Sequence, residues 1–493
     1  MRTESQQECQ RSDQQSGEDQ PRESFGEINF GQAELGDRRR TRRLVRVADA
    51  LVRHPGGSLP EKLRCSGELD GLYHLMKGKT VTHESVLAPH RTRTLQKITE
   101  HVGPVLVIHD TTELDFTTHK SLADAGQIGN GSRKGWLCHN SLAVCPKQRE
   151  VLGLASQILH RRATVRKKES AAAKREREDR ESRLWLEGTQ TLPSDQKIVD
   201  VCDRGADTFE FIEHESHSGR TFVIRSCYNR GAYIDHSVTA GRSLLHDFAR
   251  KLPSLGQWTL SVPAATLEKR PKKTGRSTIV QREKRDAVLH VAAAPVQVIA
   301  PSERRGDHGN VPLPLWIVRV WEPHPPEGVE PLEWFLLTNH PVDSFDDAYE
   351  VVGWYECRWI IEEYHKAQKT GCSIQRPQFT SSERLHPMIA LLSVVALSLL
   401  NLREQSRRED SRTRPATDVI SVDYIVQLSA WRCGKACPDW TIHDFFFALA
   451  RLGGHRNRKH DHHPGWIVLW RGWTQLQLMM EGSAALKKAK RCA

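Results

Sequence analysis

The segment from Tyr355 to Gly371 constrains the chain more than any other stretch, because it combines a long helix with one charged face. Ser344 followed by Asp347 predicts an N-terminal capping box, and Gly371 predicts the end of the helix. At about 100° per residue, five side chains fall within about 80° of one another on this helix: Tyr355, Arg358, Glu362, Lys366 and Lys369. Arginine and lysine bind phosphate oxygens, tyrosine donates a hydrogen bond and glutamate binds hard cations. The face therefore predicts either a phosphate-binding site or a solvated surface with i,i+4 ion pairs.

The spacing within this segment favours the first interpretation. Tyr355 is followed by Arg358, Glu362 and Lys369 in an order that resembles the Tyr-Arg-Glu-Lys signature of bacterial insertion-sequence transposases. These are DDE enzymes with a ribonuclease-H-like core, in the group that includes the transposon-five transposase. The neighbouring residues also resemble the sequence of that family's motif: Arg-Trp, Glu-Glu, His-Lys-Ala and Lys-Thr-Gly. The resemblance covers roughly residues 30 to 485.

Composition agrees with a large protein that binds a polyanion. The chain has 493 residues, enough for two or more domains, and a formal net charge of +11. Eleven scattered cysteines and a polar N-terminus indicate a reducing cytoplasm, which for this family is bacterial, with nucleoid association when the protein is bound to DNA. The apolar run from Met388 to Leu402 contains two serines and is short for a membrane span, so we expect a buried core helix and no membrane partner.

The sequence predicts an α/β fold, in which a ribonuclease-H-like core implied by the resemblance is interrupted by an all-β insertion. The resemblance implies that helical domains for DNA-end binding and for dimerisation flank this core. The predicted regions are a disordered tail at 1–24, the N-terminal DNA-end-binding domain at 25–100, the core at 101–220 and 331–404, the β insertion at 221–330, and the C-terminal dimerisation domain at 405–493, whose first residues to about 420 form a polar linker.

An arginine-rich amphipathic helix is predicted from Leu35 onward. Its apolar positions are Leu44, Val47, Ala48 and Leu51, and its basic stripe is formed by Arg39, Arg42, Arg43 and Arg46. Such a stripe suits phosphate contacts, although an arginine-rich solvent face is the alternative. The run Leu-Gly-Asp-x-Arg-Arg-Thr-x-Arg-Leu resembles the N-terminal end-recognition domain of the same transposases.

Two apolar segments each end in an aspartate, and both predict strands. Asp110 ends one segment and Asp203 ends the other, while Glu362 lies on the charged helix. Carboxylates that converge from different elements can hold two divalent ions about 3.5–4 Å apart, as phosphoryl transfer requires, but Asp203 could equally be a helix cap. The resemblance matches these three residues with the catalytic metal ligands of the family and implies Mg²⁺, for which Mn²⁺ can substitute. Asp115 and Asp207 are second choices.

The resemblance also implies DNA contacts outside the acidic residues. Trp334 is similar to the tryptophan on which the family stacks a flipped base, although a core tryptophan is the alternative. Tyr355, Arg358, Lys366 and Lys369 would hold phosphates near that base. Arg225 and Arg43 resemble contacts to the end DNA. Gly205 departs from the family pattern, as does the high arginine content of the N-terminal helix, which bears on end-sequence preference.

Other motifs carry less functional information. Gly129 to Gly131 lacks the lysine and serine of a phosphate loop and predicts a turn. Residues 161–188 predict a charged solvent-facing helix, and residues 269–276 predict a basic tip between strands. The C-terminal cysteines and histidines match no strong zinc pattern: Cys433, Cys437, His455, His460, His462 and His463.

These features predict a cut-and-paste DNA transposase. The family implies metal-dependent hydrolysis at the transposon end, hairpin formation, and strand transfer by a homodimer assembled on two ends. Its partners would be transposon-end double-stranded DNA and target DNA, with no small-molecule substrate. The alternatives are a non-catalytic end-binding regulator and a metal-dependent nuclease without strand transfer.

Overall fold

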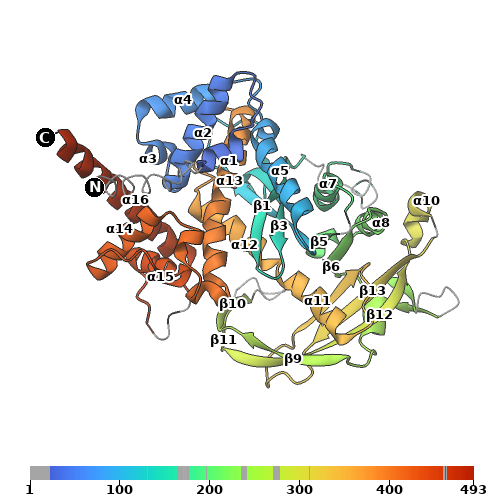
Figure 1. Cartoon of the computed structure of the whole chain (residues 1–493). Coiled ribbons are helices and arrows are strands. Elements are labelled where there is room, and N and C mark those ends of the chain that lie inside the picture. Colours follow the sequence, from blue (N-terminus) through green and yellow to red (C-terminus); the bar gives the residue numbers. More distant parts are fainter. Residues whose placement is uncertain are drawn as a thin grey trace, which may run out of the picture.

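An N-terminal helical region, a central mixed sheet and a group of C-terminal helices make up the chain (Figure 1), which confirms the predicted α/β class. The computed structural model describes residues 23–129, 131–163, 170, 173, 177–195, 197–234, 241–269, 278–309, 311–458, 461 and 463–492. Three predicted segments lie wholly or partly outside the described residues: the tail 1–24, the basic tip 269–276 and the charged helix 161–188.

The N-terminal region is helical from Phe25 to Glu100. Its helices are α1 (Phe25–Phe30), α2 (Arg38–Arg53), α3 (Leu59–Leu63), α4 (Ser66–Met76) and α5 (His83–Glu100). The α2 helix begins where Asp37 accepts a hydrogen bond from the Arg39 amide at 2.8 Å. As predicted, α2 buries Leu44, Val47, Ala48 and Leu51 against the rest of the region. Its arginines are therefore left on the outer face.

Five strands form one end of the central sheet, in the order β4-β3-β1-β5-β6. Three are antiparallel neighbours and form a meander: β1 (Val105–Asp115), β3 (Lys134–Cys145) and β4 (Glu150–His160). The short β2 (Gly126–Gln127) also pairs with β3. Next to β1 lie two parallel strands, β5 (Ile198–Cys202) and β6 (Thr221–Arg225). The prediction that the first strand ends at Asp110 is wrong, because pairing with β3 continues to Asp115.

The sheet runs without a break into the predicted β insertion. The β14 strand (Glu333–Thr338) pairs with β6 on one side and with β13 (Leu313–Trp321) on the other. Beyond β13 the strands are β12 (Arg285–Val298), β7 (Gly231–Ile234), β8 (Arg242–Leu244) and β9 (Gly256–Val262), while β10 (Ala265–Lys269) and β11 (Thr278–Arg282) form a separate pair. Short helices connect them: α9 (Leu245–Ala249), η3 (Ser302–Arg304) and α10 (Arg305–His308). The hydrogen-bonding edge of β6 is thus covered by β14.

Helices pack on both faces of the five-strand end of the sheet (Figure 1). Near β1, β3 and β6 lie η1 (Glu181–Arg183), α7 (Leu184–Gln190), η2 (Arg204–Ala206) and α8 (Phe209–His217). The other group comprises α11 (Phe345–Glu356), α12 (Trp359–Lys366), the π turn η4 (Ala367–Gly371) and α13 (Ser382–Arg407). The capping box of Ser344 and Asp347 is confirmed. The prediction of one continuous helix is wrong, because Arg358 lies in a tightened turn where its amide bonds to the Tyr355 carbonyl at 3.0 Å.

The apolar helix α13 is a core element. It is long and apolar enough to cross a membrane, but 78% of its most apolar window is buried inside the protein. The predicted polar linker from residue 405 is wrong, because α13 continues to Arg407 and residues 403–406 are buried. Arg403 is stabilised there by ion pairs with Glu363 and Glu404. The remaining elements are η5 (Glu409–Arg412), η6 (Ala416–Asp418), α14 (Val422–Cys433), α15 (Ile442–Leu452) and α16 (Trp466–Cys492).

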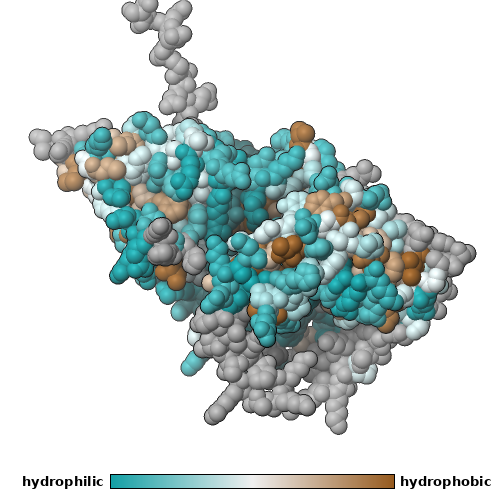
Figure 2. All heavy atoms as spheres, turned by 90° about the horizontal axis from the view of Figure 1, so that it is seen from below, coloured by the Kyte–Doolittle hydropathy of each residue, from teal (hydrophilic) through white to brown (hydrophobic). Residues whose placement is uncertain are grey.

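The surface seen from below in Figure 2 is mostly hydrophilic, with apolar residues in small groups. This pattern agrees with a mean hydropathy of −0.57. The apolar side chains of the described residues are instead concentrated in one large core, built around α13 and the sheet, and in smaller clusters beside it.

A buried polar cluster lies between the sheet and α8. His109 Nε2 is 2.8 Å from Asp200 Oδ1, and Arg220 donates to Asp200 at 2.7 Å and to Glu215 at 2.9 Å. All four side chains are almost completely buried. Burial and the nearby Asp200 carboxylate raise the pKa of Glu215 to about 8. Glu215 therefore keeps its proton at neutral pH, and Asp200 is the charged partner of Arg220.

We expect Glu215→Gln to flatten the pH dependence of stability. The folded state holds a proton on Glu215 that the unfolded chain releases above about pH 4.5, so the free energy of unfolding falls as the pH rises toward about 8. Glutamine cannot ionise, so the variant should lose less stability between these limits, as measured by urea unfolding. Glu187→Gln, on α7, should behave like the wild type. The same pH dependence in Glu215→Gln and wild type would contradict the assignment.

Candidate active site and DNA interface

Strand register brings the two predicted aspartates together. In the parallel ladder of β1 and β5, His109 is opposite Cys202, so the next residues of both strands, Asp110 and Asp203, are neighbours. Side chains alternate between the faces of a sheet, and both aspartates follow this alternation onto the same face. That face is the one on which α12 contacts β1. Asp203 also accepts a hydrogen bond from the Gly205 amide at 2.9 Å, so it caps the short η2 turn as well.

Arg358 connects the third acid to this pair. Its guanidinium donates to Asp110 Oδ2 at 3.3 Å and to Glu362 Oε1 at 2.7 Å. The tightened turn between α11 and α12 places Arg358 one turn before Glu362, which makes the i,i+4 ion pair possible. We call Asp110, Asp203 and Glu362 together the acidic cluster. Of the three acids that the sequence singled out, Asp110 and Asp203 are thus neighbours by strand register, and Arg358 joins Asp110 to Glu362.

The carboxylates of the acidic cluster carry more negative charge than Arg358 neutralises. Burial raises the pKa of Asp110 to about 7, and the Asp203 carboxylate adds to the increase, while Arg358 opposes it. Burial likewise raises the pKa of Asp203, against the effects of the Gly205 amide and of Arg358. Each carboxylate thus disfavours ionisation of its neighbour, and one arginine only partly offsets the repulsion.

The donor set of the acidic cluster suits a hard divalent ion. Among the described residues, no three His, Cys, Asp or Glu side chains gather closely enough to surround a metal ion, and Arg358 bridges Asp110 and Glu362 instead. Carboxylate oxygens from separate elements are the ligands that Mg²⁺ prefers. In donor chemistry the three carboxylates therefore match what Mg²⁺ or Mn²⁺ binds, while in this arrangement Arg358 stands between two of them. The candidate zinc ligands His460 and His462 lie outside the described residues.

Tyr355 and Arg225 lie beside the acidic cluster. Burial raises the pKa of Tyr355, which interacts electrostatically with Arg358 and Asp203 and shares a hydrogen bond with Arg225. Trp334 lies on β14 opposite Val320 and packs partly against the large core. Its indole Nε1 is buried and has no hydrogen-bond partner among the described residues. Trp334 is therefore partly a core residue, as the alternative interpretation required, but its donor is unused.

The two motif lysines occupy different environments. Lys366 is exposed and pairs with Glu363 at 2.9 Å rather than with the acidic cluster. Lys369 is half-buried in the π turn, where burial lowers its pKa, while the carboxylates of Glu113 and Asp115 oppose this effect. The helix tightening at Arg358 and the π turn both change the helical periodicity on which the common face was predicted.

The second-choice aspartates are both held by hydrogen bonds, Asp115 by local donors and Asp207 by donors from the segment after β6. Asp115 accepts from the amide and hydroxyl of Thr117 at 2.9 and 2.6 Å. Asp207 is fully buried and accepts from the Cys227 amide at 2.6 Å. Asp115 therefore stabilises a turn, and Asp207 connects the end of η2 to the segment that follows β6. Gly205, which departs from the family pattern, leaves room for Trp185, whose ring would lie 2.4 Å from an added Cβ.

Sequence reasoning missed the polar contacts that fix α12 on the sheet. Asn140, opposite Asp110 on β3, donates to Nε2 of His365 at 3.1 Å, and Gln157 donates to Asn140 at 2.7 Å. Burial lowers the pKa of His365 to about 3, so the ring is a neutral acceptor. Asn140 is separated from His365 by 225 positions, and no local pattern could have indicated their contact.

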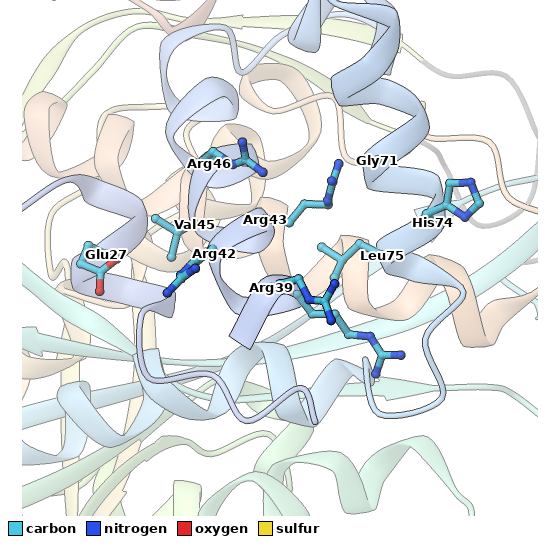
Figure 3. Close-up of a pocket in the computed structure, with 10 residues that line it drawn as sticks. Glu27, Arg39, Arg42, Arg43, Val45, Arg46, Gly71, His74 and Leu75 are labelled. Carbon is cyan, nitrogen blue, oxygen red and sulfur yellow. The ribbon is translucent and has the colours of Figure 1, made fainter. Parts of the chain in front are cut away.

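A basic pocket of about 850 Å³ lies on the outer side of the N-terminal region (Figure 3). Its charged walls are the predicted stripe of Arg39, Arg42, Arg43 and Arg46, together with Arg40, His74 and Glu27. Arg43 points toward Gly71 on α4, where an added Cβ would lie 1.6 Å from its Nη1. Within the described residues, Arg42, Arg43 and Arg46 have no carboxylate partner in an ion pair. Uncompensated arginines around one pocket attract a polyanion.

The fold and these two sites define a protein with an arginine-lined pocket on its N-terminal helices and a separate acidic cluster on a mixed sheet. Residues 22–81 match the family described as Transposase DNA-binding. The match covers α1 to α4 and every residue of the basic pocket. These residues form a transposase DNA-binding domain, and a transposase is a DNA-processing enzyme.

Removing one pocket arginine should weaken DNA binding in a salt-dependent way. Each arginine that neutralises a phosphate releases counterions, so Arg42→Ala should reduce the slope of log Kd against log salt by about 1. Fluorescence anisotropy with a duplex at several salt concentrations measures this slope. Arg432→Ala, which removes an exposed arginine of α14, is the matched control. Equal slopes for Arg42→Ala and the control would contradict a phosphate contact at Arg42.

Proposed function

We propose that the protein is a cut-and-paste DNA transposase of the DDE type. The observation that carries this proposal is the register of β1 and β5, which makes Asp110 and Asp203 neighbours on the face where Arg358 joins Asp110 to Glu362. The same chain carries a transposase DNA-binding domain at residues 22–81. DNA capture and a site with the carboxylates needed for phosphoryl transfer thus occur in one protein.

The strand arrangement supports a ribonuclease-H-like core for this enzyme. Three antiparallel strands are followed by two parallel strands, in the spatial order β4-β3-β1-β5-β6. The first acid lies on the central strand β1, the second follows its parallel neighbour β5, and the third comes from a helix that packs on β1. This arrangement agrees with the core that the sequence resemblance implied.

Asp110, Asp203 and Glu362 would hold Mg²⁺, with Mn²⁺ able to substitute. When bound, the ions supply activation of a water or 3′-hydroxyl and neutralise charge at the leaving oxygen. In the present arrangement Arg358 offsets part of the negative charge of Asp110 and Glu362. Its guanidinium can bind a DNA phosphate bidentately, which would release the carboxylates as the substrate enters.

The surrounding side chains would hold the DNA. Tyr355 and Arg225, already beside Arg358 and Asp203, would donate to phosphates next to the reacting bond. Lys369 would bind a further phosphate, and the exposed Lys366 an outer one. Trp334 would stack a flipped base on its ring.

The reaction would begin with hydrolysis at the transposon end. The released 3′-hydroxyl would then attack the other strand to form a hairpin, and hairpin opening and strand transfer into target DNA would follow at the same site. Two subunits would act on two ends, with α14 to α16 serving the pairing. The protein would work in the bacterial cytoplasm and associate with the nucleoid when bound to DNA.

The decisive test is cleavage of labelled DNA that carries the element's own ends, in the presence of Mg²⁺. Wild type should cut at the end, and Glu362→Gln should lose at least about a hundredfold in rate while still binding, because the glutamine removes an acidic ligand. Glu350→Gln, on the exposed side of α11, is the matched control and should cut normally. Binding without cutting by both wild type and Glu362→Gln would leave an end-binding regulator.

Supplying paired ends together with target DNA separates the transposase from a nuclease. A transposase joins the ends to the target, which gel electrophoresis detects as a strand-transfer product. Metal-dependent cutting without joining would identify a nuclease instead.

A further inference from the structure

The end of the helix that carries the acidic and basic motif is held by the DNA-binding domain. Lys62, on α3, is 1% exposed, and its Nζ donates to the Cys372 carbonyl at 2.8 Å. The amide of Gly57, in the preceding loop, donates to Ser373 Oγ at 3.2 Å. Cys372 and Ser373 directly follow the π turn η4, whose central residue is Lys369. We call α12 together with η4 the motif helix. Two contacts from the DNA-binding domain thus converge on the turn that ends this helix.

Burying the ammonium of Lys62 is unfavourable unless its surroundings offset the lost hydration. Burial lowers the pKa of Lys62 to about 8, and the group still carries its charge at neutral pH. Among the described residues Lys62 has no ion-pair partner, and its hydrogen bond goes to a carbonyl at the C-terminal end of a helix. That end carries partial negative charge, so the ammonium acts as a C-terminal cap for the motif helix.

The capped turn has a backbone that needs such support. Ser373 has a φ of 49°, in the left-handed region that side chains other than glycine seldom adopt. The π turn before it is closed by the Cys372 amide, which donates to the Ala367 carbonyl at 2.7 Å. An extra residue in a turn rotates the side chains around it relative to a regular helix. The orientation of Lys369 near Glu113 and Asp115 therefore depends on this turn.

We propose that Lys62 is a positioning residue, which fixes the end of the motif helix and thereby the place where Lys369 meets a DNA phosphate. This inference rests on the proposed function. It means that the domain that binds the DNA end also sets the geometry of Lys369, near Glu113 and Asp115, at the end of the helix that carries Glu362. DNA binding by the N-terminal domain and the placement of Lys369 would then be coupled, because direct contacts connect the two.

The test is single-turnover cleavage of the end DNA at saturating DNA and Mg²⁺, using the full-length chain. Lys62→Met keeps the length of the side chain but removes the charge and the donor. We expect its cleavage rate to fall by about tenfold or more, because small displacements of positioning groups have large effects on rate. Its Kd for the end should change by less than about twofold, since Lys62 is buried and touches no DNA. Lys251→Met, which removes an exposed lysine of the β region, should match wild type.

A double variant separates positioning from general destabilisation. If Lys62 acts through Lys369, then Lys62→Met should cause no further loss of rate in a Lys369→Ala background. Ser373→Gly provides a second, well-folded probe of the same turn, because glycine adopts a positive φ without strain and lacks the hydroxyl that Gly57 contacts. It should slow cleavage and be equally non-additive with Lys369→Ala.

The outcomes separate the positioning role of Lys62 from the proposed transposase activity. Multiplicative losses in the double variants, or wild-type rates in both Lys62→Met and Ser373→Gly, would overturn the positioning role while leaving the transposase intact. Absence of cleavage by wild type itself would overturn the proposed function and the inference together.

Discussion

The parallel pairing of β1 and β5 is the constraint on which both faces of the sheet depend. His109 and Asp200 face one side, where they bond to each other and, through Arg220, to α8. Asp110 and Asp203 face the other side as neighbours. A slip of one residue would reverse every side chain of one strand, burying an acid and separating the histidine from its carboxylate. The buried polar cluster thus locks the register that assembles the acidic cluster.

The motif helix is fixed from several directions at once. Arg358 ties its start to β1, His365 accepts a hydrogen bond from β3, and Lys62 caps its end. On its outer side Glu363 accepts from Trp466 of α16 at 2.6 Å and pairs with Arg403 of α13. Such fixation matters because catalytic groups must keep their geometry while they exclude water and bind charge. It also connects the acidic cluster to the N-terminal and C-terminal helices.

The basic pocket and the acidic cluster lie on different elements of the protein, so a polyanion can bind the pocket without contacting the carboxylates. Arg42, Arg43 and Arg46, which have no carboxylate partner among the described residues, line the basic pocket, where phosphates can compensate them. The acidic cluster would repel DNA, and Arg358 with Arg225 beside it reduces this repulsion. The net charge of +11 is therefore a sum over separate basic and acidic regions, and it does not indicate a uniformly basic surface.

The sequence by itself determined the local features. The arginine stripe of α2, the strands around Asp110 and Asp203, and the capping box at Ser344 follow from periodicity and capping, which act within a few residues. Tertiary structure decided the rest. The interruption of the long helix at Arg358, and the burial of polar residues where a linker was predicted after 405, arise from packing against distant segments.

The site shows the same division. Its three acids could be chosen from the sequence because each stands in a recognisable local motif, but their proximity required the β1–β5 register. Asn140 and Lys62 could not be chosen, since their partners lie 225 and 310 positions away. An asparagine in a strand and a lysine in a short helix are ordinary surface residues until the fold buries them. Only the three-dimensional arrangement gives them a polar partner and hence a role.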